Sequence, residues 1–225
     1  MSATLIVSYD GTENDDDALA LAKLLAECGA TLALAYVRHA REFDQGREAI
    51  AQHDAERRLE QGAARLGNPS VPRHVVFSPS TGEGLERLAQ TEGAAIIVFG
   101  SDYRTPPGHA EPGGSAQHLL EGGTVAIAIA PAGLRADPGA SLGTIAVGPS
   151  DSDTAPQETA ESLASRLGAT VVPVGGDGAS FDLIVIGSQS TAPEGRIALS
   201  GTSRALLNTV QGSVLALPRG RPVQF

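Results

Sequence analysis

The sequence predicts an α/β protein built around a parallel sheet, in two related copies. Short runs rich in Val, Ile and Leu alternate with helical patterns, which is typical of parallel sheets whose crossovers are helices. The sequence Gly-Ala-Thr occurs at residues 29–31 and again at 168–170. An apolar run that ends in Gly-Ser occurs at 96–101 and again at 183–188. Because repeats set the architecture of a chain, we expect two modules of one design.

The second copy is shorter than the first. The two Gly-Ala-Thr sequences are 139 residues apart, whereas the two Gly-Ser sequences are 87 apart, so the second copy lacks 52 residues from its middle. Segment 131–140 is rich in Pro, Gly and Ala, a composition typical of linkers. We therefore expect a complete domain at residues 1–135 and a truncated domain at residues 141–225.

In the first copy, hydrophobic periodicity predicts alternating strands and helices. Helix 14–28 has Asn14 or Asp15 as its expected N-cap, because such side chains accept hydrogen bonds from first-turn amides. Asp16 and Asp17 suit the positive end of the helix dipole, and Gly29 marks the C-terminal stop. The expected strands are 4–8, 31–37, 74–77, 95–99 and 125–129, and the expected helices are 14–28, 42–66, 83–92 and 114–121.

The second copy repeats this order without the long second helix, the third strand and the helix that follows it. Its expected strands are 144–148, 170–174, 183–186 and 214–217, and its helices are 154–167 and 202–210. Residues 175–180 alone separate two of these strands, whereas a parallel crossover usually takes a dozen or more residues. Either this crossover is unusually tight, or strand 170–174 is an edge hairpin partner; the sequence leaves both open.

Composition argues against several classes of function. Aromatic residues make up 4% of the chain and Trp is absent, so the cores must be aliphatic. The net charge of −10 disfavours a duplex nucleic-acid binder, which needs basic surface. No apolar run approaches the ~20 residues of a membrane span, and no basic leader precedes the first strand. The single cysteine, Cys28, lies on an apolar helix face and is expected to be buried. We expect a soluble cytoplasmic protein with no nucleic-acid or membrane partner.

Three segments are expected to converge at one edge of the predicted sheet. Open α/β sheets bind ligands beyond the carboxyl ends of their strands. The first strand leads into Asp10 and Gly11, the second ends at Val37, and the fourth ends at Gly100. The segment after Gly100 is a loop rich in Gly and Pro that opens a helix, a place where amides and the helix dipole can hold a phosphate.

Several features together resemble the universal stress protein family. They are the strand-end Asp-Gly-Thr before an Ala-rich helix, the sequence Val-Phe-Gly-Ser at 98–101, and a glycine loop that leads through Gly-Gly-Ser into a helix and a short apolar strand. The resemblance covers nearly the whole chain as two tandem modules. It implies a flavodoxin-like parallel sheet of strand order 3-2-1-4-5, with the modules paired through their fifth strands. It also implies a non-catalytic, stress-related protein with ATP or AMP as ligand and no metal.

Carried over position by position, the resemblance places a candidate nucleotide site in the first module. Asp10 matches the first-strand aspartate near the nucleotide, and Val37 matches the residue whose backbone contacts adenine. The amides around the loop glycines would hold the phosphates. The candidate residues are Asp10, Val37, Gly100, Gly113, Gly114 and Ser115.

Both modules depart from the family pattern Gly-x2-Gly-x9-Gly-Ser/Thr. Tyr103 stands at the second loop glycine, and three prolines at 106, 107 and 112 remove amide donors. In the second module, Pro149 stands at the aspartate position and Ser190 at the second loop glycine. These departures favour an alternative: a scaffold or interaction module that has lost nucleotide binding, with another protein or a second copy of the chain as partner.

Enzymatic and metal-binding interpretations are weaker. Asp10-Gly11-Thr12 is similar to the start of the haloacid-dehalogenase-like phosphatase motif, but Ser8 stands where that chemistry needs a nucleophilic Asp. Three consecutive aspartates at 15–17 suit helix capping better than a metal, because adjacent helical residues point in different directions. A slow ATPase is a third hypothesis, although the chain's only lysine, Lys23, lies in a helix.

Overall fold

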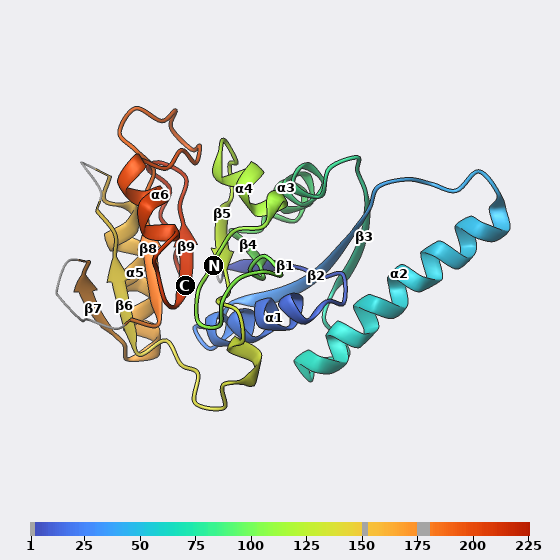
Figure 1. Cartoon of the computed structure of the whole chain (residues 1–225), viewed down its shortest axis with the longest axis horizontal. Coiled ribbons are helices and arrows are strands. Elements are labelled where there is room, and N and C mark those ends of the chain that lie inside the picture. Colours follow the sequence, from blue (N-terminus) through green and yellow to red (C-terminus); the bar gives the residue numbers. More distant parts are fainter. Residues whose placement is uncertain (1–2, 150–152, 175–180) are drawn as a thin grey trace.

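The computed structural model describes residues 3–149, 153–174 and 181–225. Within these residues one nine-stranded sheet runs through both modules in the order β3-β2-β1-β4-β5-β9-β8-β6-β7 (Figure 1). The predicted first-module order, 3-2-1-4-5, is confirmed. The first module contributes β1 (Thr4–Ser8), β2 (Thr31–Arg38), β3 (Arg73–Phe77), β4 (Ile96–Phe99) and β5 (Ala126–Ile129), and the second contributes β6 (Thr144–Val147), β7 (Thr170–Pro173), β8 (Leu183–Ile186) and β9 (Ser213–Ala216).

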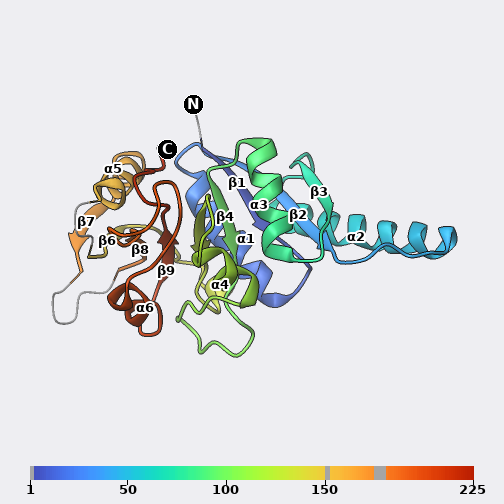
Figure 2. The ribbon, with the colours of Figure 1, turned by 90° about the horizontal axis from the view of Figure 1, so that it is seen from above.

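Helices cover both faces of the sheet. Helices α1, α2 and α5 pack on one face, and α3, α4 and α6 pack on the other. Helix α2 extends well beyond the sheet (Figures 1 and 2), and its buried residues all lie between Ala55 and Ala63. The helices are α1 (Glu13–Ala26), α2 (Gln45–Leu66), α3 (Thr81–Glu92), α4 (Gly114–Leu120), the 3₁₀ helix η1 (Leu134–Ala136), α5 (Ala155–Leu167) and α6 (Gly201–Leu207).

The two modules join through their last strands. Strands β5 and β9 pair antiparallel, with Ile127 opposite Ala216 and Ile129 opposite Val214. All four residues of β4, β5, β8 and β9 are buried, as expected for central strands covered on both faces. The fifth-strand pairing that the family resemblance implied therefore occurs within one chain.

The edge-hairpin interpretation of strand 170–174 is wrong. Strand β7 runs parallel to β6, from Thr144 opposite Thr170 to Val147 opposite Pro173. Strand β6 lies between β7 and β8. The short connection at residues 175–180 lies outside the described residues.

The expected N-caps of the first helix are also wrong. Helix α1 begins at Glu13 and its N-cap is Thr12, which makes no side-chain cap hydrogen bond. Asp15 instead turns toward the preceding loop, because the exposed amides of that loop offer its carboxylate two donors. Otherwise the predicted elements are present with ends shifted by at most three residues, and only η1 was not predicted.

Asp17 has a different role from the one its sequence position suggested. Its side chain is fully buried, so it does not serve as a surface charge at the helix dipole. Its carboxylate accepts hydrogen bonds from the backbone N–H of Gly133 at 2.9 Å and of Arg135 at 2.8 Å. The guanidinium of Arg135 lies 2.9 Å from the same carboxylate. Asp17 therefore anchors the linker that follows β5 to α1.

Two further expectations concern Cys28 and membranes. Cys28 is buried as predicted, and burial raises the pKa of its thiol to about 11. Over the described parts of the chain, no helix has the length and apolar character needed to cross a membrane.

Candidate functional site

Strand β2 runs further than its neighbour β1. Ser8 and Ala35 form the last pair of the β1–β2 ladder. Beyond that pair, β2 continues to Arg38 along its other neighbour, β3. The side chain of Val37 is buried, but its peptide groups lie past the end of β1.

The direction of the Val37 peptide groups follows from the strand register. Leu34 N–H donates to the Pro72 carbonyl at 2.9 Å, and Ser78 N–H donates to the Arg38 carbonyl at 3.1 Å. Leu34 and Arg38 therefore direct their backbone groups toward β3. Because the two neighbours of a strand are bonded by alternate residues, Val37 directs its N–H and C=O to the other side, where β1 has ended. A ligand with both a donor and an acceptor edge can pair there.

Two aspartates close the loop after β1. The carboxylate of Asp15 accepts hydrogen bonds from the N–H of Asp10 at 2.5 Å and of Gly11 at 3.2 Å. Asp10 accepts from Thr12 N–H at 3.0 Å and remains exposed. Burial, and the neighbouring Asp10 carboxyl, raise the pKa of Asp15 to about 8. The loop thus presents the Asp10 carboxyl at the end of β1 beside an acid that holds its proton at neutral pH.

Arg58 brings helix α2 to this loop. Its guanidinium donates to the Asp10 carbonyl at 3.0 Å and lies 5.4 Å from the centre of the Tyr36 ring. Sequence reasoning missed both Arg58 and the bonds of Asp15. The spacing of Asp10 and Asp15 across a helix start could have indicated the hydrogen bonds of Asp15. The sequence pattern of α2 does not indicate the contact of Arg58.

Gly100 is required by packing. A Cβ at this position would lie 2.0 Å from the backbone oxygen of Asn14, so the start of α1 rests directly on the end of β4. The Asn14 side-chain amide also donates to the Ser101 carbonyl at 2.8 Å. Gly100 therefore allows the start of α1 to pack closely against the end of β4.

The loop that follows, residues 101–112, is closed by its own hydrogen bonds. The Ser101 hydroxyl donates to the Ala130 carbonyl at 2.6 Å and accepts from Glu111 N–H at 3.2 Å. Asp102 N–H donates to the Glu111 carbonyl at 2.9 Å. Tyr103, which stands where the family has a glycine, is 73% exposed and does not fill the site. The loop accommodates Tyr103 by directing its ring into solvent.

Helix α4 begins without a side-chain cap. Its N-cap is Gly113, and a Cβ at Gly113 or Gly114 would meet nothing within 4 Å. The first-turn amides at Gly114 and Ser115 have no intrahelical acceptor, as at any helix start. At the equivalent place in the second module, 87 residues on, Ser200 caps α6 by accepting from Ser203 N–H at 3.1 Å. The open helix start is thus a property of the first module.

The structure therefore places the predicted residues in two groups. Asp10 and Gly100 follow β1 and β4, and Val37 lies near the end of the adjacent β2, all at one edge of the sheet, while residues 113–115 form the start of α4. Among the residues that the structure describes, no group of three or more His, Cys, Asp or Glu side chains could hold a metal ion.

The fold and this edge define a flavodoxin-like α/β protein of two tandem modules. The family model described as "Universal stress protein family" matches residues 1–130, and the chain belongs to that family. Among curated proteins, none matches the chain.

Solved structures with the same fold cover nearly the whole chain. A universal stress protein from Archaeoglobus fulgidus DSM 4304 has a TM-score of 0.71 at 15% identity, over 98% of this chain and 100% of that one. A functionally unknown protein from Pseudomonas aeruginosa PAO1 has a TM-score of 0.66 at 16% identity, over 97% of this chain and 93% of that one. At such identities the likeness shows a shared fold.

Proposed function

We propose that the first module binds an adenine nucleotide, ATP or AMP, and that this stress protein acts in the cytoplasm by binding rather than by catalysis. The N–H and C=O of Val37 would pair with the adenine edge. The Asp10 carboxyl would accept hydrogen bonds from ribose hydroxyls. The amides of Gly114, Ser115 and Ala116, at the positive end of α4, would hold phosphate oxygens.

The observation that carries this proposal is the difference between the starts of α4 and α6. Ser200 accepts from Ser203 N–H, the third amide of α6, whereas Gly113 leaves the equivalent amide of α4, at Ala116, without a side-chain cap. A glycine N-cap with no side-chain acceptor exposes amides that favour an anion. The module with the open helix start is also the one that keeps Asp10 and a β2 longer than β1.

Within this proposal, the amides around Gly100 would also lie near the phosphates, and Gly100 and Asp15 both support the shape of the site. Gly100 allows α1 to pack against β4. Asp15 holds the amides of Asp10 and Gly11, which fixes the direction of the Asp10 side chain. No metal belongs to the proposed site.

Calorimetric titration of ATP and AMP into the full chain tests the proposal. We expect micromolar binding to the wild type and weaker binding to Asp10→Ala. A matched control is Asp54→Ala, which removes an aspartate from α2 that forms a surface ion pair with Arg57. Binding should be unchanged in that control. A titration that shows no heat at millimolar nucleotide would contradict the proposal.

A scaffold function without nucleotide binding is the second candidate function. Hydrogen bonds between loops of the first module and loops of the second favour it. Gly212 N–H donates to the Gly108 carbonyl at 3.0 Å, and Ile197 N–H donates to the Gly123 carbonyl at 2.8 Å. Each loop therefore helps to join the modules. Nucleotide released on denaturing the purified protein, detected by mass spectrometry, would exclude this candidate. ATP turnover abolished by Asp10→Ala would favour the ATPase hypothesis instead.

A further inference from the structure

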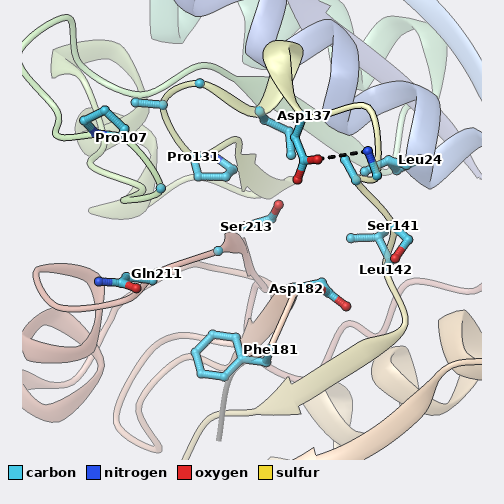
Figure 3. Close-up of a pocket in the computed structure, with 17 residues that line it drawn as sticks. Leu24, Pro107, Pro131, Asp137, Ser141, Leu142, Phe181, Asp182, Gln211 and Ser213 are labelled. Carbon is cyan, nitrogen blue, oxygen red and sulfur yellow. Dashed lines mark hydrogen bonds between the residues drawn. The ribbon is translucent and has the colours of Figure 1, made fainter. Parts of the chain in front are cut away.

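A cavity of about 400 Å³ lies at the junction of the two modules (Figure 3). Its walls come from the linker at residues 131–142, the loop at 107–108, the starts of β8 and β9, and Leu24 of α1. It shares no residue with the candidate nucleotide site. Small-molecule sites of ~300–1,000 Å³ are common at such interfaces between domains.

Ser213 is a buried polar residue that faces this cavity. The residue is 1% exposed, and Figure 3 shows its hydroxyl directed into the space below the linker. Its backbone N–H donates to the Asp182 carbonyl at 2.9 Å. Its side-chain hydroxyl has no hydrogen-bond partner among the described residues. Every fully buried side-chain N or O among the described residues has a hydrogen-bond partner. Because the Ser213 hydroxyl has none, its oxygen cannot be fully buried, and its small exposed area faces the cavity. Buried hydroxyls normally have a partner, which points to a polar ligand group opposite Ser213.

The charged side chains among the described residues that line the cavity are both carboxylates. Asp137 faces the cavity and uses one oxygen to accept from Gly139 N–H at 2.9 Å (Figure 3). One oxygen of Asp182 accepts from Thr144 N–H at 2.8 Å. Each carboxylate therefore has a second oxygen outside these bonds. A cleft lined by one sign of charge attracts ligands of the opposite sign.

Besides the polar side chains of Gln211 and Ser141, the cavity has apolar walls. They include the ring of Phe181, the rings of Pro107 and Pro131, and the side chain of Leu142. Such surfaces fit a hydrocarbon body, and an aromatic ring also attracts a nearby cation. A bare metal ion fits poorly, because it requires several oxygen ligands around it.

We propose that this junction cavity binds a small alkylammonium ligand, with the ammonium at Asp137 and Ser213 and the alkyl body against Phe181 and Pro131. The ammonium N–H groups would donate to the Asp137 carboxylate and the Ser213 hydroxyl. Asp182 adds negative charge from the opposite wall. Such a ligand would connect the linker to the second module, because its two main contacts belong to different parts of the chain.

Amide NMR titrations of the full chain test this proposal with three probes of equal length: n-butylammonium, n-butanol and butyrate. We expect saturable shifts at residues 137–142 and 211–213 with n-butylammonium, much weaker shifts with n-butanol and none with butyrate. Asp137→Asn should weaken n-butylammonium binding by about fivefold, the usual scale of an exposed ion pair. Ser213→Ala should also weaken it. Asp54→Asn, the same change of charge on α2, should leave it unaltered.

Several results would overturn the proposal. They are the absence of saturable shifts, equal shifts with n-butanol, and an Asp54→Asn effect as large as that of Asp137→Asn. Full competition by sodium or magnesium chloride at matched ionic strength would assign the carboxylates to an inorganic cation and would overturn it too. Asp137 is exposed, so its variant is expected to fold even where Ser213→Ala does not.

Discussion

The loops after β4 and β8 have the same internal design although their sequences differ. Ser101 and Ser188 each donate to the carbonyl that follows the last strand of their module, Ala130 at 2.6 Å and Leu217 at 2.8 Å. Each hydroxyl also accepts from the amide ten residues later, at 3.2 Å and 3.1 Å. A network that is present in both copies, including the copy without the aspartate, serves the architecture of the module.

The surroundings of the two loops differ. The first module has Asp10, a β2 that passes the end of β1, and an uncapped Gly113. The second has Pro149 and Ser200 at the equivalent positions and lacks the segment that corresponds to α2. The comparison teaches that ligand binding must depend on what surrounds the loop, since the closed loop itself is common to both modules.

The largest effect on stability is expected from Gly100→Ala. The added methyl group would lie 2.0 Å from the Asn14 backbone oxygen, so α1 or β4 must move. The equivalent Cβ at Gly187 would lie 2.7 Å from a ring carbon of Pro156. Overpacking costs about 1–3 kcal/mol and more where backbone must shift. In urea unfolding we expect Gly100→Ala to cost more than about 3 kcal/mol and Gly187→Ala about 1–2 kcal/mol. Equal costs would show that the two helix–strand junctions tolerate a methyl group alike.

The next effect concerns two buried polar residues, one in α1 and one in α5, that bind corresponding segments of their modules. Asp17 and Thr159 are the fifth residues of their helices, and both are fully buried. Each binds the segment after the last strand of its module: Asp17 through Gly133, Arg135 and a charge, and Thr159 through Val223 N–H at 2.9 Å. The modules thus use an ion pair and a neutral hydroxyl for the same task.

Replacing each of these two residues by alanine should show how much stability the ion pair and the neutral hydrogen bond each contribute. Asp17→Ala leaves two amides and a guanidinium without their carboxylate, which we expect to cost about 3 kcal/mol. Thr159→Ala removes one neutral hydrogen bond and should cost about 1 kcal/mol. Thermal unfolding of both variants measures the difference. A Thr159→Ala cost that equals or exceeds that of Asp17→Ala would show that the charge adds nothing at the linker.

The last effect is a dependence of stability on pH, which is small when expressed as the change in unfolding free energy per pH unit. The third residue of α1 is Asp15, whereas the third residue of α5 is the neutral Gln157. Because the pKa of Asp15 is raised from 3.8 to about 8, the folded protein binds more protons than the unfolded chain between these values. The contribution of Asp15 to stability is complete below pH 4 and is lost as pH rises through about 8, by at most about 1.4 kcal/mol per pH unit.

Asp15→Asn removes this titration and makes the first helix resemble the second. The difference in unfolding free energy between wild type and Asp15→Asn should therefore change with pH between 4 and 8, with the wild type losing stability relative to the variant. Chemical unfolding at a series of pH values provides the measurement. A difference that is constant across this range would show that Asp15 is ionised in the folded protein.

The strands and helices could be predicted from local patterns because each buries an apolar face of regular period. The repeat predicted two modules, and the family resemblance implied their pairing through the last strands, which meet at β5 and β9. The position of Val37 followed from the family resemblance, but the direction of its peptide groups depends on the register with β3, which no local pattern contains. The parallel pairing of β7 was open for the same reason, because six residues are compatible with two connections.

The roles of side chains that contact distant segments could not be predicted from the sequence. Asp17 reads as one of three acidic residues at a helix start, yet its partners lie 116 and 118 residues away in the linker. Arg58 reaches Asp10 across 48 residues. The junction cavity is assembled from five separate segments, so no short pattern indicates it.

The most direct test exchanges the helix starts of the two modules. Gly113→Ser would give α4 the side-chain cap that Ser200 gives α6, and Ser200→Gly is the reverse change in the second module. In calorimetric titrations with ATP, we expect Gly113→Ser to abolish the micromolar binding of the wild type, while Ser200→Gly leaves it intact. Retained binding in Gly113→Ser, or equal loss in Ser200→Gly, would contradict the account that the open start of α4 holds the phosphates.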